Sequence, residues 1–284
     1  QQGARVTVGC RDVEGAKHLK VQGVVGQVTP VHVDVTKGDN IAAALQGADM
    51  AINLCGILFE SGRNRFDAVQ GTAPGVIAAE AAKAGVSKFV HVSAIGADAN
   101  SASREAAVKS AFPTATILRP SVVFGPDDDF FNRFGAMAEA ISILPLIGGG
   151  RTKFQPVYVD DVARAAFVAL TSDTAEGKTY ELGGPTIYTL KEVMELVVAQ
   201  TARKCRMVEI PFWLASLKAT FLELLPTPPL TRDQVILLKS DNVVSEGAAT
   251  LADLGIKPTA CEAILPTYLD RFRPGGRYNR FRAA

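Results

Sequence analysis

The fold is decided by two stretches, Lys88-Phe-Val-His-Val-Ser-Ala-Ile-Gly96 and Ala115-Thr-Ile-Leu-Arg-Pro-Ser-Val-Val-Phe-Gly125. Each contains a continuous run of apolar and β-branched residues, which predicts a short buried strand. One helical segment, Arg104–Phe112, lies between them. This order, with continuous apolar runs, predicts parallel strands that are covered on both faces. Ligands of such sheets bind where loops leave the carboxyl ends of the strands, so the loops at Ser93 and Pro120 should line a crevice.

The alternation of strands and helices extends through residue 125 and predicts an α/β fold with a doubly wound, parallel, Rossmann-like sheet. Earlier strands are expected at Arg5–Cys10, Val28–Asp34 and Met50–Gly56. Helices are expected at Asn40–Gln46 and Thr72–Ala84, the second of which ends at a glycine.

A glycine-rich phosphate loop normally follows the first strand of such a fold. Neither G-x-G-x-x-G nor G-x-x-G-x-x-G occurs in this sequence. Gly3-Ala-Arg-Val6 is typical of the turn before a second strand, so we expect the first strand and its glycine loop to be absent from this chain. The alternative is a fold that has lost its phosphate loop.

The connection from Gly96 to Phe112 is also short for a crossover between parallel strands, which usually needs a dozen or more residues. We therefore hold as a second hypothesis that residues are absent between Ser103 and Arg104.

A domain boundary is expected near residue 186, because the pattern changes there from alternating strands and helices to helices alone. Residues 1–186 should form the nucleotide-binding domain, and residues 187–284 a smaller, mostly helical domain with which 126–152 packs. The helices expected in the smaller domain are Leu190–Arg203, Phe212–Leu225, Arg232–Lys239 and Cys261–Phe272.

Two features near the C-terminus bear on partners. The Phe212–Leu225 helix is apolar on nearly every face, which indicates burial by its own domain, by a partner protein or by a membrane surface. It falls short of the ~20 apolar residues that cross a bilayer. The tail is basic, and it is either solvated or docked on an acidic partner or anionic lipid; its arginines are Arg271, Arg273, Arg277, Arg280 and Arg282.

Composition excludes several kinds of site. The formal net charge of +1 over 284 residues gives no argument for a nucleic-acid partner. The four cysteines have no metal-type spacing and are best explained as buried free thiols. Three adjacent carboxylates, Asp127-Asp128-Asp129, cannot all converge on one ion, so we expect a solvated turn there and no metal site.

Candidate cofactor ligands follow the expected strands. Arg11 stands where a dinucleotide fold meets the adenosine ribose, and an arginine there suits the 2′-phosphate of NADP(H), although a solvated arginine is the alternative. The carboxylate of Asp34 could accept a hydrogen bond from adenine, or it could cap the next turn. Gly56 would let the backbone approach a ligand closely.

Catalytic residues are not indicated. Proteins of this build commonly transfer hydride with a Tyr-x-x-x-Lys motif, in which the lysine lowers the pKa of the tyrosine one helical turn away. None of the five tyrosines has a lysine four residues later. Ser93 could orient a carbonyl group, but His91 is better explained as a core residue with its hydrogen bonds satisfied. We therefore expect no catalytic residue.

Several motifs together resemble those of known proteins. Three of them are shared across the extended short-chain dehydrogenase/reductases: Ile52-Asn-Leu-Cys-Gly56, His91-Val-Ser-Ala94 and Leu118-Arg-Pro-Ser121. More specific are Phe124-Gly-Pro-Asp-Asp-Asp-Phe-Phe-Asn-Arg133, Lys153-Phe-Gln-Pro-Val-Tyr-Val-Asp-Asp-Val162 and Leu230-Thr-Arg-Asp-Gln-Val235. With these, the whole chain resembles the nucleotide-binding, dehydrogenase-like accessory subunits of respiratory complex I (NADH:ubiquinone oxidoreductase).

The resemblance implies that NADPH is bound tightly without being turned over. The residues implied to contact it are Arg11 at the 2′-phosphate, Asp34 and Val35 at the adenine, Leu54, Cys55 and Gly56 along the middle, and Ser93, Ala94, Pro120, Ser121 and Val122 at the nicotinamide end.

The resemblance also implies a location. The C-terminal part would dock on other complex I subunits at the junction of the hydrophilic and membrane arms, near the quinone site. The protein would then be peripheral on the mitochondrial inner membrane, matrix side, or on a bacterial plasma membrane, cytoplasmic side. The alternative function is an active NAD(P)-dependent extended short-chain reductase or epimerase, and a nucleotide-sensing regulator is a third.

Overall fold

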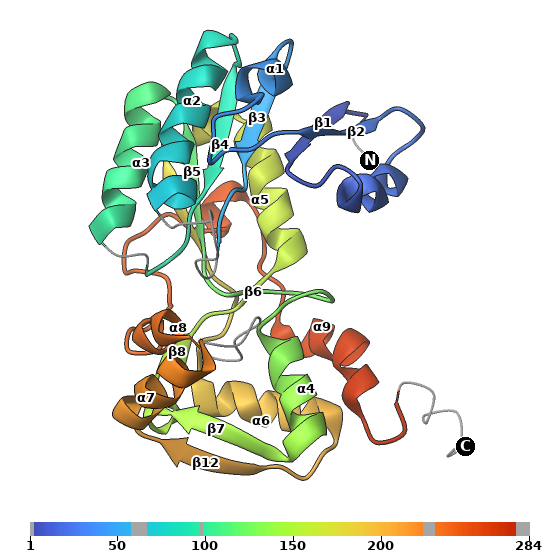
Figure 1. The fold of residues 1–284 in the computed structure, drawn as a ribbon, viewed down its shortest axis with the longest axis vertical. Helices are drawn as coiled ribbons and strands as arrows, with labels where there is room; N and C mark the ends of the chain where they lie inside the picture. The colour runs from blue at the N-terminus through green and yellow to red at the C-terminus, as the bar shows by residue number, and fades with distance from the viewer. Residues whose placement is uncertain (1–2, 58–66, 97–98, 224–230, 277–284) are drawn as a thin grey trace. The chain divides into compact units, whose positions relative to one another are not determined.

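The computed structural model describes residues 3–57, 67–96, 99–223 and 231–276 (Figure 1). Parallel strands dominate it, as the sequence predicted. The strands that the site depends on are β1 (Val6–Cys10), β2 (Val28–His32), β3 (Met50–Asn53), β4 (Lys88–Val92), β5 (Thr116–Pro120) and β10 (Thr179–Leu182). One sheet has the order β10-β5-β4-β3, and β1 and β2 form another. The pairs β1–β2 and β3–β4 are parallel, so the carboxyl ends of the two strands in each pair lie at the same edge.

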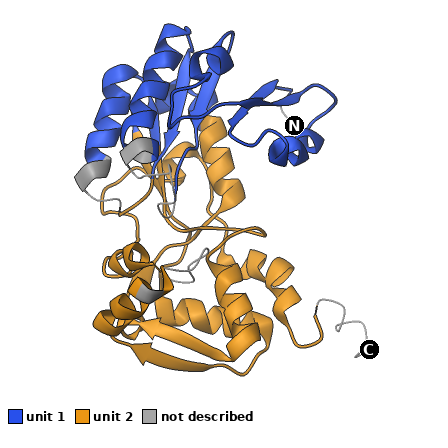
Figure 2. Ribbon diagram, viewed as in Figure 1, with its two compact units in different colours: residues 1–93, 97–117, 169–178 blue, residues 94–96, 118–168, 179–284 orange. Residues whose placement is uncertain are grey.

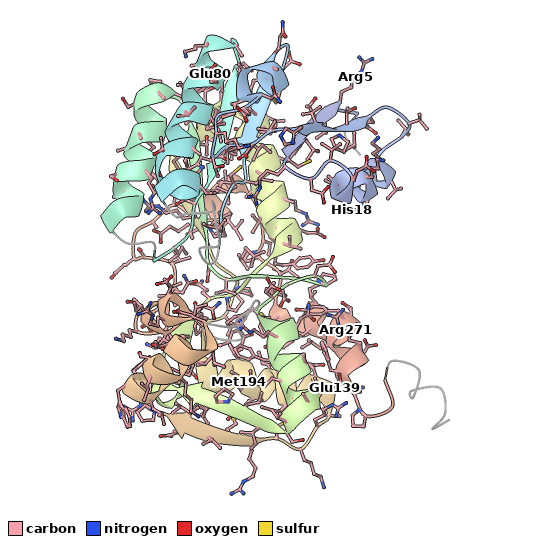
Figure 3. The ribbon with its side chains drawn as sticks, in the orientation of Figure 1. Arg5, His18, Glu80, Glu139, Met194 and Arg271 are labelled. Carbon is pink, nitrogen blue, oxygen red and sulfur yellow. The ribbon has the colours of Figure 1, made fainter. Side chains whose placement is uncertain are left out.

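The strand expected at Arg5–Cys10 forms as β1, at the β-branched run Val6-Thr-Val8. It is the first strand of the structure, which corrects the expectation that the first strand is absent. It pairs with β2 from Val6 opposite Val28 to Cys10 opposite His32. A short 3-10 helix, η1 (Gly15–Gln22), then leads toward β2. Nearby, the Arg5 and His18 side chains are exposed (Figure 3).

Helices α1 (Ile41–Leu45), α2 (Ala73–Lys83) and α3 (Ala99–Ala111) belong to the same part of the chain. α2 lies beside α3, and it also contacts β3 and β4 (Figure 1). Phe89 from β4 meets Phe112 at a ring-centroid distance of 5.5 Å, within a core that also holds Ile117. α3 runs unbroken through Ser103 and Arg104, so the structure does not support a join at that position.

The chain divides into two compact units (Figure 2). Unit 1 consists of residues 1–93, 97–117 and 169–178, and unit 2 consists of 94–96, 118–168 and 179–284. This division does not test the domain boundary expected near residue 186, which stays a prediction.

Unit 2 holds the remaining strands and α-helices. They are β6 (Val123–Phe124), α4 (Phe131–Ile141), β7 (Ile143–Ile147), β8 (Lys153–Phe154), β9 (Val157–Tyr158), most of α5 (Val159–Thr171), β11 (Tyr188–Thr189), α6 (Leu190–Thr201), β12 (Arg206–Ile210), α7 (Phe212–Leu222), α8 (Arg232–Leu237) and α9 (Cys261–Tyr268). β12 pairs in parallel with β7, β9 with β6, and β11 in antiparallel fashion with β8.

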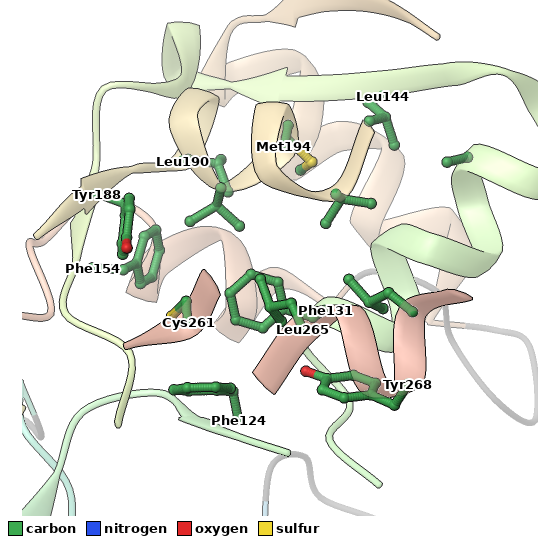
Figure 4. Close-up of a cluster of buried hydrophobic side chains, with 14 of the residues drawn as sticks. Phe124, Phe131, Leu144, Phe154, Tyr188, Leu190, Met194, Cys261, Leu265 and Tyr268 are labelled. Atoms are coloured by element: carbon green, nitrogen blue, oxygen red, sulfur yellow. The ribbon is translucent and has the colours of Figure 1, made fainter. Parts of the chain in front are cut away.

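The core of unit 2 joins residues far apart in sequence (Figure 4). Phe131 from α4, Met194 from α6 and Leu265 from α9 are fully buried in it. Segment 126–152 therefore packs against the later helices. The apolar spacing on each of these helices explains the packing, since each buries one stripe against its neighbours.

Helix α7 is only partly covered by its own unit. Ala215 and Ala219 are buried against Ile147 and Val235, whereas Trp213 is 69% exposed and Leu217 is 51% exposed. Residues 224–230, which include the end of the helix expected at Phe212–Leu225, lie outside the described residues. Within the described part of the chain, no helix is both long and apolar enough to cross a bilayer.

Gly184 makes one test of this packing. A Cβ at that position would overlap the carbonyl oxygen of Pro156, and the Gly184 amide already donates to Gln155 O at 3.2 Å. Gly184→Ala should lower the free energy of unfolding by about 1–3 kcal/mol, because backbone must move to admit the methyl group. Urea denaturation measures this.

The matched control is Gly75→Ala in α2, where the new Cβ would meet Ala107 Cβ at an ordinary 3.4 Å. A helical alanine replaces glycine there, so stability should rise by roughly 0.5–1 kcal/mol. Equal effects of the two substitutions would contradict the packing described for Gly184.

Candidate functional site

Three predicted ligands follow the carboxyl ends of strands in unit 1: Arg11 after β1, Asp34 after β2 and Cys55 after β3. Burial raises the pKa of the Cys55 thiol, and the positive charge of Arg11 acts in the opposite direction. Arg11 also contributes to the lowered pKa of Asp34. The positive charge of Arg11 therefore acts on both side chains.

Asp34 is 9% exposed and already holds the turn after β2. Its Oδ1 accepts from the Thr36 hydroxyl at 2.6 Å and from the Thr36 amide at 3.0 Å, and Lys37 Nζ lies 3.7 Å from Oδ2. The Thr36 hydrogen bond is the main reason why the pKa of Asp34 is lowered. Of the two roles expected for Asp34, a contact with adenine or the cap of the next turn, the structure shows the cap of the turn.

Asn53, at the end of β3, was missed by the sequence analysis. Its Oδ1 accepts from the Cys55 amide at 3.0 Å, and its Nδ2 lies 3.1 Å from Nδ1 of His91. Asn53 is 2% exposed, so its hydrogen bonds fix the backbone that presents exposed Leu54 and Gly56. The only hint in the sequence was an amide directly after a buried strand.

His91 is buried in β4, and the prediction that it is a satisfied core residue is confirmed by its contact with Asn53. Burial lowers the pKa of His91, while the negative charge of Glu105 raises it. A neutral imidazole whose Nδ1 accepts from Asn53 serves the packing of β3 on β4. Ser93, two residues later, is half-buried, and its hydroxyl makes no hydrogen bond with any described residue.

In unit 2, the loops after β4 and β5 meet at Asn242. The buried Ser121 hydroxyl donates to Asn242 Oδ1 at 2.6 Å, and the Val122 amide donates to the same atom at 3.1 Å. Asn242 Nδ2 donates to Ile95 O at 2.8 Å. Pro120 O accepts from the Ile95 amide at 3.0 Å, which closes the contact between the two loops. Asn242 carried no signal in the sequence, since it lies 120 residues from Val122 and 147 residues from Ile95.

Gln155 plays a similar part beside the loop after β10. Its Nε2 donates to Gly184 O at 2.8 Å, and its Oε1 accepts from the Val244 amide at 3.0 Å. A Cβ on Gly183 would overlap the Gln155 side chain, which explains why glycine stands there. The predicted nicotinamide-end residues in unit 2 thus sit in a tightly bonded group of loops, with Ala94 exposed and Pro120 buried.

The tyrosines of the described chain are poorly suited to proton transfer. Burial raises the pKa of four of them, Tyr158, Tyr180, Tyr188 and Tyr268, whereas a tyrosine acid/base needs the opposite shift.

In the aspartate run 127–129, Asp127 and Asp129 are exposed, as expected of a solvated turn, whereas Asp128 is partly buried and hydrogen-bonded. Asp128 Oδ1 accepts from the amides of Phe131 and Asn132 at 2.6 and 3.1 Å, and Tyr268 donates to its other oxygen. The carboxylate thus satisfies free amides at the start of α4. Among the described residues, no group of three His, Cys, Asp or Glu side chains could hold a metal ion.

Known protein families and relatives match this chain. Residues 1–121 match a family model described as NAD(P)H-binding, and residues 99–183 match the NAD dependent epimerase/dehydratase family. Over 97% of its length the chain is 36% identical to NADH dehydrogenase (ubiquinone) 1 alpha subcomplex subunit 9, mitochondrial, of Arabidopsis thaliana, of which it covers 74%. The chain belongs to the family of the NADH:ubiquinone oxidoreductase 40 kDa subunit.

Two further members support the assignment. The chain is 33% identical to the Mus musculus subunit 9, with 92% of the chain and 72% of the relative covered. It is 30% identical to the 40 kDa subunit of NADH-ubiquinone oxidoreductase from Neurospora crassa, with 98% and 76% covered. The resemblance found in the sequence motifs is therefore confirmed.

Solved structures support the fold. The NADPH-dependent quinone oxidoreductase of Escherichia coli has a TM-score of 0.71 at 17% identity, covering 95% of this chain and 90% of the other. The triphenylmethane reductase of Citrobacter has a TM-score of 0.71 at 18% identity, covering 95% and 91%. At these identities the similarity shows a Rossmann-like α/β fold.

The lowered pKa of His91 gives a test of the Asn53–His91 pair. The unfolded chain takes up a proton near the ordinary histidine value of about 6.5, whereas the folded chain resists it. Stability should therefore be complete above about pH 6.5 and fall as the pH drops below it. His91→Gln should remove this part of the pH dependence, measured by urea denaturation between about pH 7.5 and about pH 5.5.

The control is His18→Gln, at an exposed position on η1, which should keep the pH dependence of the original chain. An unchanged slope in His91→Gln would show that the pair does not hold His91 neutral.

Proposed function

We propose that this protein is a non-catalytic accessory subunit of respiratory complex I that binds NADPH as a structural cofactor. It would stabilise the junction of the hydrophilic and membrane arms near the quinone site. The observation that carries the proposal is identity of 30–36% to subunits of NADH:ubiquinone oxidoreductase over nearly the whole chain. The protein would be peripheral on the energy-transducing membrane, either the mitochondrial inner membrane on its matrix side or a bacterial plasma membrane on its cytoplasmic side.

NADPH binding is supported by the residues that follow each of the strands β1, β2, β3, β4 and β5. Arg11 would bind the 2′-phosphate, since a guanidinium forms bidentate hydrogen bonds with phosphate oxygens. Val35 and Asp34 would lie at the adenine, and the backbone at 54–56 along the middle of the cofactor. Residues 93–94 and 120–122 would flank the nicotinamide. The match of residues 1–121 to an NAD(P)H-binding model agrees with this assignment.

The absence of turnover is supported by chemistry within the described residues. Tyr188 donates to Glu262 at 2.7 Å and Tyr268 donates to Asp128, so both hydroxyls are already hydrogen-bonded to carboxylates. Ser93 could hold a carbonyl group in place, but it cannot supply a proton to a substrate by itself.

Docking on other complex I subunits is supported by the exposed face of α7. Trp213 and Leu217 are four residues apart, so they lie on one face of the helix, and both are largely exposed. Large aromatic side chains of this kind supply much of the binding energy in protein interfaces. Exposed Lys218 and Lys239 lie on α7 and just after α8, where anionic lipid headgroups would also be attracted.

A second candidate is an active NAD(P)-dependent extended short-chain reductase or epimerase. The observation in its favour is the match of residues 99–183 to the NAD dependent epimerase/dehydratase family. Steady oxidation of NADPH by the purified protein with a quinone or a sugar nucleotide would establish it.

Arg11→Ser tests the cofactor assignment. Loss of the guanidinium should weaken NADPH binding about tenfold or more and leave NADH binding nearly unchanged, because only NADPH carries the 2′-phosphate. Dissociation constants come from titrations of cofactor fluorescence. Arg5→Ser, at an exposed arginine just before β1, is the control and should affect neither cofactor. Equal affinity of the unaltered protein for both cofactors would refute the role given to Arg11.

Replacement of the exposed apolar pair on α7 tests docking. The double variant Trp213→Ser, Leu217→Ser should keep its free energy of unfolding within about 0.5 kcal/mol, because both side chains are mostly solvated. Its recovery with complex I on native gels should fall sharply. The control is Val24→Ser, Val25→Ser, an exposed apolar pair in unit 1. Full incorporation of the α7 variant would exclude this face as the docking surface.

A further inference from the structure

The side chain of Asn242 uses its hydrogen-bonding groups on two separate loops. Oδ1 accepts from the Ser121 hydroxyl and the Val122 amide, both after β5, while Nδ2 donates to Ile95 O, after β4. A Cβ on Gly96 would lie 3.7 Å from that same Nδ2. One amide side chain therefore fixes the spacing of the two loops.

The backbone of Asn242 is held as firmly as its side chain. Its amide donates to Lys153 O at 2.8 Å, and its carbonyl accepts from the Gln155 amide at 3.0 Å, which makes a β-bridge to Phe154. Its neighbour Asp241 accepts from the Lys153 amide at 2.8 Å. Because both ends of the residue are anchored on β8, its side chain is presented to the loops in one position.

The chemistry of the contacts requires an amide. The oxygen must accept from two donors while the nitrogen donates to a carbonyl, and only asparagine and glutamine carry an acceptor oxygen and a donor nitrogen in one side chain. Aspartate at this position would keep the acceptor but turn a second oxygen toward Ile95 O. Alanine would leave the buried Ser121 hydroxyl with the Asn242 backbone carbonyl alone.

We propose that Asn242 is the positioning residue for the nicotinamide end of the cofactor site. It holds the loops that carry Ala94 and residues 120–122 at a fixed separation. This inference rests on the proposed function for the location of the cofactor. The link between the loops and residue 242 stands on the hydrogen bonds alone.

Binding of two ligands, NADPH and 2′,5′-ADP, distinguishes a positioning role of Asn242 from a merely structural one. Asn242→Ala should weaken NADPH binding about tenfold and leave the affinity for 2′,5′-ADP unchanged, because that fragment occupies only the adenosine end. Asn242→Asp, which keeps the acceptor for Ser121 and Val122, should show a smaller loss for NADPH. The control Tyr188→Phe removes a buried hydrogen bond elsewhere in unit 2 and should alter neither ligand.

Hydrogen exchange of the unliganded protein provides an independent measurement. Asn242→Ala should speed exchange at the Val122 amide, which loses its acceptor, and at Ile95 in the facing loop, with no change at the amides of β1 and β2. If the unaltered protein binds no NADPH, the proposed function fails, and exchange still decides the role of Asn242. Equal loss of both ligands, or unchanged exchange at both loops in Asn242→Asp and Asn242→Ala, would overturn the inference.

Discussion

Parallel pairing is the constraint on which the site depends. Because β1 pairs in parallel with β2, and β3 with β4, the loops that leave the carboxyl ends of each pair emerge at the same edge of that pair. Parallel strands also need helical crossovers, which α2 and α3 supply and which bury Phe89 and Ile117. The pairing that forms the core of unit 1 therefore also fixes where the loops after its strands begin.

Collecting loops at one edge creates a second requirement, since their backbone polar groups are partly removed from water. Such groups cost free energy unless they are hydrogen-bonded. Asn53 meets this requirement in unit 1, and Asn242 and Gln155 meet it in unit 2. Asn53 serves the backbone two residues later, whereas Asn242 and Gln155 each serve backbone groups from distant parts of the chain. The conformation of these loops is consequently a property of side-chain amides as much as of strands.

Helix α7 has one buried face and one exposed face. Its alanines, Ala215 and Ala219, allow close packing on Ile147 and Val235, while Trp213 and Leu217 face outward. Trp213 and Leu217 thus leave an apolar face of α7 exposed.

The sequence by itself determined the parallel α/β class, most strand positions and the family, because apolar periodicity and local motifs are short-range properties. It also placed His91 correctly in the core. It misjudged the first strand and the role of Asp128 within the aspartate turn, and it missed Asn53 and Asn242. Only the tertiary structure decided those points: a hydrogen bond between Asn242 and Ser121, or between Tyr188 and Glu262, depends on how distant segments meet, and no local pattern encodes that meeting.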